Sequence, residues 1–385
     1  MFALSAVWWV AITLGHSAGL VFPWQVAPGL AHGLLMSGSF MPMFFTGFLF
    51  TAGPRWLQRP TVTALTLRLP VASHLVGWLS FMLGTHLSLH LAVAGLVLAA
   101  AGLGQVSWQF GQMLRRIQVT DTTHARQLLA GCLTGTALLL LAAAALATDR
   151  PALTRAALHA GLWACNALVF VAAIHRMLPF FSDAALDAWP AQSLLWLLVT
   201  ALGTEALSVV AEMLGWPRPI WLATAQTLYE ATLAALLLWL AWRSRRRPSP
   251  SMRLLVMLHV GFVWLGLAFA LSAVSGVRAL MGHANLGLAP LHALTAGFMG
   301  SSLFAMVARI SAGHSGRTVA TDNFVWRLFS LLQLAVIGRV CAALWPAVAP
   351  ALLPVTAIAW AVASGAWALR YGRGYGQARI DGRPG

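Results

Sequence analysis

Long apolar stretches follow one another along almost the whole chain and leave little polar sequence between them. Each is about 18–25 residues long, which is the length of helix that crosses a hydrocarbon core roughly 30 Å thick. Charged residues make up only 9% of the chain, whereas a soluble domain carries roughly 25%. The stretches do not alternate in polarity as the strands of a membrane barrel do. The sequence therefore predicts an all-α integral membrane protein.

Twelve of these stretches are expected to form a bundle of transmembrane helices. Their ranges are 2–22, 31–53, 67–84, 86–112, 124–146, 154–179, 190–212, 218–242, 253–275, 285–308, 324–343 and 348–369. The first has no basic n-region and no clear cleavage site, so we interpret it as a retained helix and not as a signal peptide. No long polar linker interrupts the series. We therefore expect one polytopic domain over residues 1–370 and a basic cytoplasmic tail over residues 371–385.

The net charge of +15 follows the membrane topology. All 24 basic residues are arginines, and five of them fall on the side of the membrane that we predict to be outside. These five are Arg150, Arg155, Arg218, Arg278 and Arg339. The other arginines fall in the opposite loops and in the tail, so the positive-inside rule places both termini in the cytoplasm. We expect the tail to contact anionic lipid headgroups, and we expect no nucleic-acid partner.

Three histidines recur at one position, within the first turn or two of an even-numbered stretch near the outer surface: His32, His159 and His292. The rise of a helix places His292 on the order of 5–10 Å below the outer boundary. Ionisable groups at such depths usually face the bundle interior and have partners. A neutral imidazole there can be an axial haem ligand or a copper ligand. The alternative is a hydrogen bond to a carbonyl or serine of a neighbouring helix.

Other polar groups near the outer surface could complete such a site. Arg278 and Arg339 are natural partners for haem propionates. His86 and His90, in the segment THLSLH, are four residues apart and are expected on one helical face, where they could hold a metal ion or form an interfacial, solvated cap. The cysteines Cys132, Cys165 and Cys341 are isolated, and the sequence has no CxxCH motif for covalent haem attachment.

Three carboxylates fall within apolar stretches. Glu205 and Glu212 are seven residues apart and are expected on one helical face, and Glu230 belongs to the following stretch. Carboxylates at this depth are costly unless they are protonated or paired. They could form a proton route towards a redox centre, or they could serve as interhelical hydrogen-bonding groups.

Two stretches repeat the tripeptide Leu-His-Ala followed by an arginine. Arg176 lies seventeen residues after His159, and Arg309 lies seventeen residues after His292. Both stretches are expected to run from outside to inside. The repetition could come from an old duplication, from one local function used twice, or from chance.

Three segments resemble the signatures of the NnrS family. HALTAGFMGSSLFAMVARISAGHSGR, at 292–317, resembles the family pattern that begins HALT and ends R-x-S-x-G-H-[ST]-G-R. MLPFF at 177–181, preceded by Arg176, resembles the G-R-x-x-P-F-F segment, and TGFLFTAGPRW at 46–56 resembles GFLLTA-x-PNW. Two positions depart from the family pattern, since Gly33 replaces the acidic neighbour of His32 and His175 replaces a glycine.

The resemblance implies a haem- and copper-containing inner-membrane protein of bacteria that is linked to nitric oxide metabolism and resistance to nitrosative stress. The expected cofactors are a b-type haem and copper, and the expected small-molecule ligand is nitric oxide. Residues at family motif positions are His32, His292, Arg176, Arg309, His314 and Arg317. The turn GHSGR, at 313–317, lies at the opposite membrane face from His292 and could bind an anion or a second cofactor, or could set the end of its helix.

Other functions fit the same features. A redox enzyme acting on nitric oxide would use the carboxylates to supply protons. A proton-coupled transporter would use the intramembrane His and Glu side chains as substrate or proton sites. An accessory protein would act with denitrification or respiratory complexes as partners.

Overall fold

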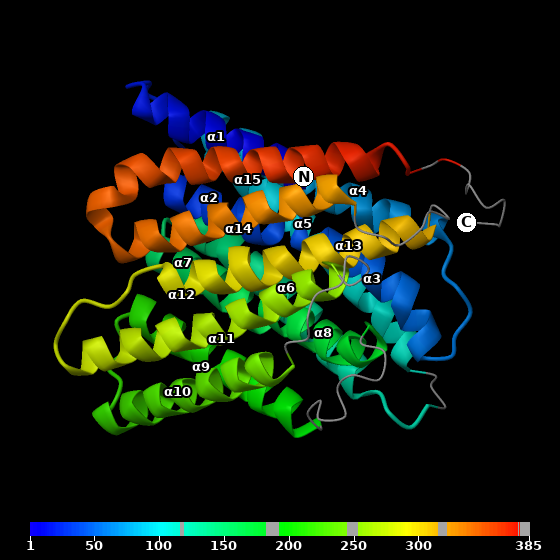
Figure 1. Cartoon of the computed structure of the whole chain (residues 1–385). Helices are drawn as coiled ribbons and strands as arrows, with labels where there is room; N and C mark the ends of the chain where they lie inside the picture. Colours follow the sequence, from blue (N-terminus) through cyan, green and yellow to red (C-terminus); the bar gives the residue numbers. More distant parts are fainter. Residues whose placement is uncertain (116–118, 182–191, 245–252, 315–321, 376, 378–385) are drawn as a thin grey trace. The chain divides into compact units, whose positions relative to one another are not determined.

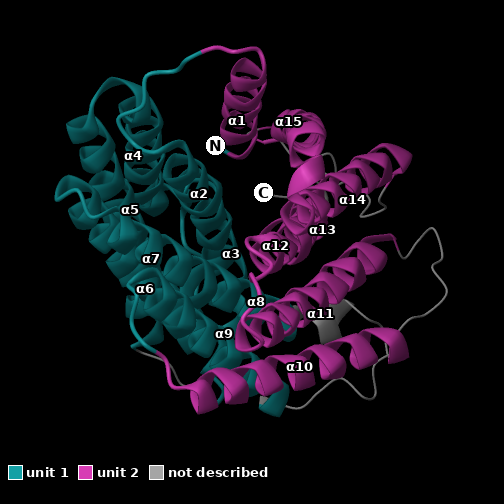
Figure 2. Ribbon diagram, turned by 90° about the vertical axis from the view of Figure 1, so that its left-hand side faces the viewer, with its two compact units in different colours: residues 1, 21–177, 190–217 teal, residues 2–20, 178–189, 218–385 magenta. Residues whose placement is uncertain are grey.

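The computed structural model of the chain describes residues 1–115, 119–181, 192–244, 253–314, 322–375 and 377. All regular secondary structure within these residues is helical, as Figure 1 shows, which confirms the predicted all-α fold class. The helices form two compact units, which Figure 2 colours separately. Unit 1 comprises Met1, Val21–Met177 and Pro190–Pro217, and unit 2 comprises Phe2–Leu20, Leu178–Trp189 and Arg218–Gly385.

Unit 1 is built by helices that pack mainly against their neighbours in the chain. They are α2 (Pro28–Gly38), α3 (Met41–Trp56), the short 3₁₀ helix η1 (Ala64–Leu67), α4 (Arg68–Leu87), α5 (Leu89–Leu114), α6 (Thr123–Ala147), α7 (Pro151–Gly161), the π-helix η2 (Leu162–Ala167), α8 (Leu168–Phe181) and α9 (Gln192–Met213). The pairs α4–α5, α5–α6 and α6–α7 form antiparallel hairpins, and α7 also packs against α2 and α9.

Unit 2 follows the same principle of packing between neighbours. Its helices are α1 (Phe2–Ser17), α10 (Ile220–Arg243), α11 (Arg253–Leu280), α12 (Ala289–His292), the π-helix η4 (Ala293–Met299), α13 (Gly300–His314), α14 (Asn323–Leu344), the 3₁₀ helix η5 (Pro346–Val348) and α15 (Ala349–Gly372). Helix α11 packs against α10 and against the broken stretch α12–η4–α13, while α15 packs against α14 and α1.

The closest helix pair, α4–α5, depends on glycine. A Cβ atom on Gly77 would lie 2.4 Å from the backbone N of Ala99, and one on Gly95 would lie 2.4 Å from the backbone N of Phe81. No side chain fits at either distance. Small residues at helix contacts are the means by which membrane helices approach each other closely, since burial between helices gains little where lipid is equally apolar.

The helical segments match the predicted stretches, and nine of them within the described residues are long and apolar enough to cross a membrane. Helix α1, with 16 residues, is shorter, and α4 and α10 fall outside that set. The all-α membrane fold is therefore confirmed, whereas twelve crossings and cytoplasmic termini stay predictions.

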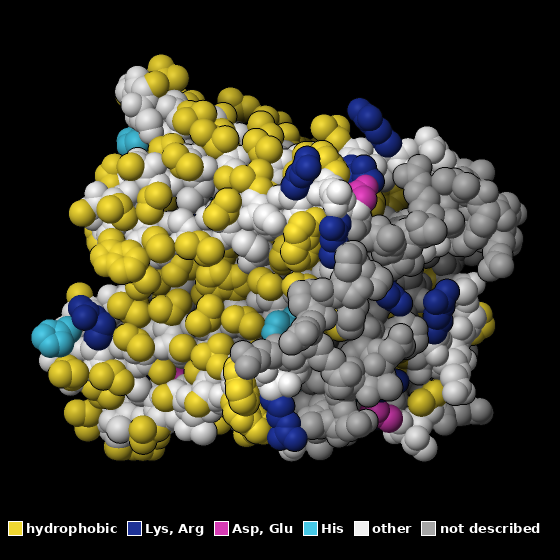
Figure 3. Space-filling model, in the orientation of Figure 1, with side chains coloured by type: hydrophobic (Ala, Val, Ile, Leu, Met, Phe, Trp, Pro, Cys, Tyr) yellow, Lys and Arg dark blue, Asp and Glu magenta, His cyan; other side chains and the backbone are white. Residues whose placement is uncertain are grey.

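The surface of the helices agrees with a membrane environment. Large apolar side chains are exposed along α14 and α15, among them Leu334, Ile337, Val355, Ile358 and Val362. Figure 3 shows apolar side chains over most of the described surface in this view, with most of the visible arginines toward one end of the helices. Water does not favour such a surface, but hydrocarbon does. The chain is a multi-pass membrane protein.

Candidate functional site

Three helical stretches carry a histidine near one end and are broken shortly after it. Helix α2, with His32, ends at Gly38, and α3 begins at Met41. The π-helix η2 begins three residues after His159, and the π-helix η4 begins directly after His292. Short π-helical turns inside α-helices are rare and occur frequently at functional sites. The two π-helices lie on the two stretches that repeat Leu-His-Ala.

The same three stretches are the most buried of the candidate membrane spans among the described residues. The buried share of the most apolar window is 72% for Pro28–Trp56, 78% for Pro151–Arg176 and 72% for Ala289–Ser311, against 17–44% for the other six spans. The histidine on each stretch is half-buried. This is the interior placement that ionisable groups within a membrane require.

The imidazole of His292 is oriented by its own helix. Its Nδ1 lies 2.8 Å from the carbonyl oxygen of Leu288. A carbonyl only accepts, so Nδ1 carries a proton, and in the neutral form of this ring the lone pair is on Nε2. Histidines that bind metals commonly donate their other ring N–H to a backbone carbonyl, which fixes this tautomer. The structural alternative is a bond to a carbonyl or serine of a neighbouring helix, whereas the Leu288 carbonyl belongs to the same stretch as His292.

Within unit 1 the helices of His32 and His159 lie against each other. A Cβ atom on Gly33 would come within 2.5 Å of Leu158 Cδ2. Gly33 adjoins His32, and Leu158 adjoins His159. A side chain at position 33, such as the acidic residue of the family pattern, would displace this leucine methyl group. Glycine at position 33, in place of the acidic residue of the family pattern, therefore allows Leu158 to pack closely against α2.

The prediction of a metal site at His86 and His90 assumes that both residues lie on one continuous helix. This assumption is wrong. Ser88 has an extended backbone with φ −163° and ψ 130°, so α4 ends at Leu87 and α5 begins at Leu89. The break is needed because the chain reverses here between two closely packed helices. The two imidazoles therefore belong to different helices and do not have the spacing of one helical face.

The contacts of His86 favour its role as an interfacial group. Its Nδ1 donates to the carbonyl oxygen of Pro23 at 2.9 Å, and its ring packs against that of Trp24 with centroids 4.6 Å apart. His90 is exposed in the first turn of α5. A metal role for either residue stays a prediction.

The two arginines predicted to bind propionates lie in unit 2. Arg278 is exposed at the end of α11, and its Nε donates to the carbonyl oxygen of Ala284 at 2.8 Å. Arg339 is half-buried on α14. Arg278 therefore also has a structural role in the loop after α11, and propionate binding stays a prediction for both.

The three carboxylates have different surroundings. On α9, Glu205 is buried, with 6% of its surface exposed, whereas Glu212 is exposed. In unit 2, Glu230 is 4% exposed and its Oε1 accepts a hydrogen bond of 2.7 Å from Gln226 Nε2. The exposed Arg218 donates in turn to Gln226 Oε1 at 3.2 Å. A chain of hydrogen bonds thus connects an exposed guanidinium with a buried carboxylate.

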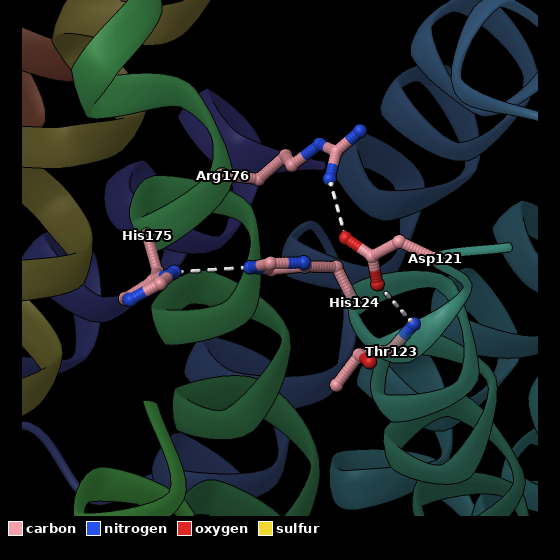
Figure 4. A network of polar contacts seen from close by, with 5 residues as sticks. All are labelled: Asp121, Thr123, His124, His175 and Arg176. Carbon is pink, nitrogen blue, oxygen red and sulfur yellow. Dashed lines mark hydrogen bonds and ion pairs between the residues drawn. The ribbon is translucent and has the colours of Figure 1, made fainter. Parts of the chain in front are cut away.

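A polar network occupies the end of unit 1 that the charge pattern predicts to be cytoplasmic (Figure 4). Arg176 Nη1 lies 3.2 Å from Asp121 Oδ2, and its guanidinium lies 5.5 Å from the ring centroid of Trp56. The backbone N–H of Thr123 donates to Asp121 Oδ1 at 3.1 Å. This hydrogen bond, with help from the charge of Arg176, lowers the pKa of Asp121. Arg176 therefore links α3, α8 and the start of α6.

The same network contains a pair of histidines that the sequence analysis did not predict as a site. His124 Nε2 on α6 lies 3.0 Å from His175 Nδ1 on α8, and the rings are stacked with an interplanar angle of 30°. One nitrogen must donate and the other must accept, so at least one ring is neutral. The two residues are 51 positions apart, and only the departure of His175 from the family pattern marks either of them.

The remaining motif positions lie on or beyond α13. Arg309 is half-buried, whereas the side chain of His314 and all of Arg317 lie outside the described residues. Within the part of the chain that the structure describes, no group of three or more His, Cys, Asp or Glu side chains could hold a metal ion. Haem needs only one or two imidazoles as axial ligands, so the oriented His292 fits haem. No three-ligand copper centre is assembled among the same described residues.

Comparison with known proteins agrees with the sequence motifs. The family model described as NnrS protein matches residues 1–379. Comparison with curated proteins and with solved structures yields no match. The family match covers both units and includes all three signature segments. This multi-pass membrane protein therefore belongs to the NnrS family.

Proposed function

We propose that this protein binds haem and copper in the inner membrane of bacteria and acts in nitric oxide metabolism or in protection from nitrosative stress. Family membership supports the cofactors and the gas. The observation that carries the haem assignment is the burial of the three broken stretches, each with a half-buried histidine near one end. The proposed copper follows from the family resemblance alone.

In this proposal the histidines would bind haem and the hydrogen-bonded chain in unit 2 would handle protons. His292 would bind haem iron through Nε2 while Nδ1 donates to the Leu288 carbonyl. His32 and His159 would serve a second site within unit 1. Bound haem supplies an iron that coordinates nitric oxide. If the protein reduces the gas, the chain from Arg218 through Gln226 to Glu230 would hold a proton on a buried carboxylate.

One observation favours a second candidate, a proton-coupled transporter. Glu230 is buried and hydrogen-bonded to Gln226, an arrangement suited to a carboxylate that gains and loses a proton during transport. The two candidates differ in cofactor content. A transporter of this kind needs no absorption band from haem, whereas the first candidate requires one.

Replacement of His292 by alanine tests the haem assignment. We expect the purified variant in detergent to lose much of its haem, measured as pyridine haemochrome per chain, and to keep its helicity by circular dichroism. The reason is that alanine removes Nε2 but leaves the helix intact. In the unaltered protein, addition of nitric oxide should shift the Soret band.

His283→Ala is the matched control, because His283 is exposed in the loop after α11 of the same unit. Its haem content should equal that of the unaltered protein. Equal haem in both variants would remove His292 from the site. If protein produced with an excess of haem and metal shows no Soret band, that result would favour the transporter.

A further inference from the structure

A partly open cavity of about 40 Å³ lies within unit 1 and is lined by α2, α3, α5, α6, α7 and η2. A cavity needs roughly 10–15 Å³ on this measure to hold one water molecule. The cavity is therefore large enough for a diatomic molecule or one xenon atom.

The wall of the cavity is mostly aliphatic, with Leu34, Leu103 and Leu158 among the side chains that line it. Two polar side chains also line it, and both donate to backbone carbonyls. Ser37 Oγ donates to the Gly33 carbonyl oxygen at 2.7 Å, and Asn166 Nδ2 donates to the Ser37 carbonyl oxygen at 2.9 Å. A buried water needs two to four polar partners, and apolar cavities stay dry and bind species such as xenon. We expect this cavity to exclude water.

The two helix breaks of unit 1 create this space. Helix α2 ends just before Ser39, and Pro42 in the first turn of α3 lines the cavity. On the other side, Cys165 and Asn166 of the π-helix η2 line it. A π-turn has a wider backbone than an α-turn and so separates its neighbours. The bond from Asn166 to the end of α2 holds the two breaks at the same level.

The cavity shares α2 and α7 with the two histidines of unit 1, but neither imidazole is among the side chains that line it. We infer that this cavity is a docking site for an uncharged diatomic gas. The identity of that gas as nitric oxide rests on the proposed function. The cavity itself, its size and its dry wall do not.

Xenon tests the cavity without any cofactor. In crystals of the full chain under xenon pressure, anomalous density should place a xenon atom between Ala142, Leu158 and Cys165. Ala142→Leu should lower its occupancy at least tenfold, because the buried Ala142 lines the cavity and a larger side chain fills it. Ala144→Leu, on the exposed face of the same helix, is the control and should keep the xenon.

If Ala142→Leu does not fold, Ala157→Val fills the space from α7 instead. Ordered water in the cavity, or xenon that survives both filling variants, would overturn the inference. If the purified protein binds xenon but contains no haem, the docking site is supported and the proposed function is refuted. The two proposals can therefore fail independently.

Discussion

His74 and His292 show why burial of a histidine does not identify a ligand. His74 is 4% exposed, and both of its nitrogens are engaged by the protein. Its Nδ1 lies 3.1 Å from the Ala99 carbonyl oxygen, and its Nε2 lies 3.1 Å from both Trp78 Nε1 and the Gly38 carbonyl oxygen. His292 is half-buried, and its Nδ1 contacts a carbonyl of its own helix. The two residues differ in burial and in the helices they contact, and the sequence contains no sign of that difference.

Asp121 permits a prediction about pH at the scale of a single residue. Its pKa is lowered in the folded protein by the Thr123 N–H and by Arg176, so its contribution to stability is present above the ordinary aspartate range and is lost as the pH falls through the folded pKa. At pH 7, Asp121→Asn should cost roughly 0.2–1 kcal/mol, as exposed ion pairs do. Below the folded pKa the two proteins should unfold at the same temperature.

Thermal unfolding in detergent, followed by tryptophan fluorescence across this pH range, measures the effect. Asp149→Asn is the matched control, since Asp149 is an exposed loop residue at positive φ, which asparagine tolerates. A difference between Asp121→Asn and the unaltered protein that persists unchanged in acid would show that the carboxylate charge is not what stabilises the network.

At the scale of elements, the π-helices determine which face of a stretch its histidine presents. A stretch with one extra residue in a turn is rotated relative to a regular α-helix, because each residue turns the helix by about 100°. The repeated Leu-His-Ala segments share this irregularity between the histidine and the arginine seventeen residues later. A common π-turn strengthens the interpretation of the two segments as one local design used twice.

Deletion of Ala296, inside η4, tests the role of the π-turn. Because a π-turn holds one residue more than an α-turn, the deletion should restore regular α-helix and leave the rotation of His292 relative to α13 unchanged. Deletion of Leu303, in the regular α-helix beyond η4, should instead rotate His292 by about 100° relative to the rest of α13. Haem content should stay near that of the unaltered protein in the first variant and fall as far as in His292→Ala in the second, while circular dichroism stays unchanged in both. Equal haem content in the two variants would show that the rotation of this stretch does not position the histidine.

At the scale of the whole molecule, arginine distribution predicts orientation in the membrane. With five arginines on one side and all the rest on the other, the positive-inside rule places the C-terminus in the cytoplasm. A green fluorescent protein fused to the C-terminus should therefore fluoresce. Alkaline phosphatase at the same position should be inactive, and the same enzyme fused after Gly287, in the loop before α12, should be active. The opposite result for these fusions would show that the C-terminus lies outside the cytoplasm.

The sequence predicts the helices well because the thickness of hydrocarbon imposes their length, and each predicted stretch has its helical counterpart. It does not predict the breaks. The interruption after Gly38, the π-turns and the extended Ser88 depend on how neighbouring helices pack, which periodicity does not encode. For the same reason the pairing of His124 with His175 was missed. Individual candidate residues can be named from motifs, but their partners come only from the fold.

The hydrogen bond from Asn166 to the Ser37 carbonyl has a mechanical consequence. It connects the break at the end of α2 with the π-helix η2, so a change in the backbone at one of these irregular sites would disturb the other. A molecule in the cavity that moved the two helices apart would have to lengthen or break this hydrogen bond, so the bond limits how far the cavity can widen.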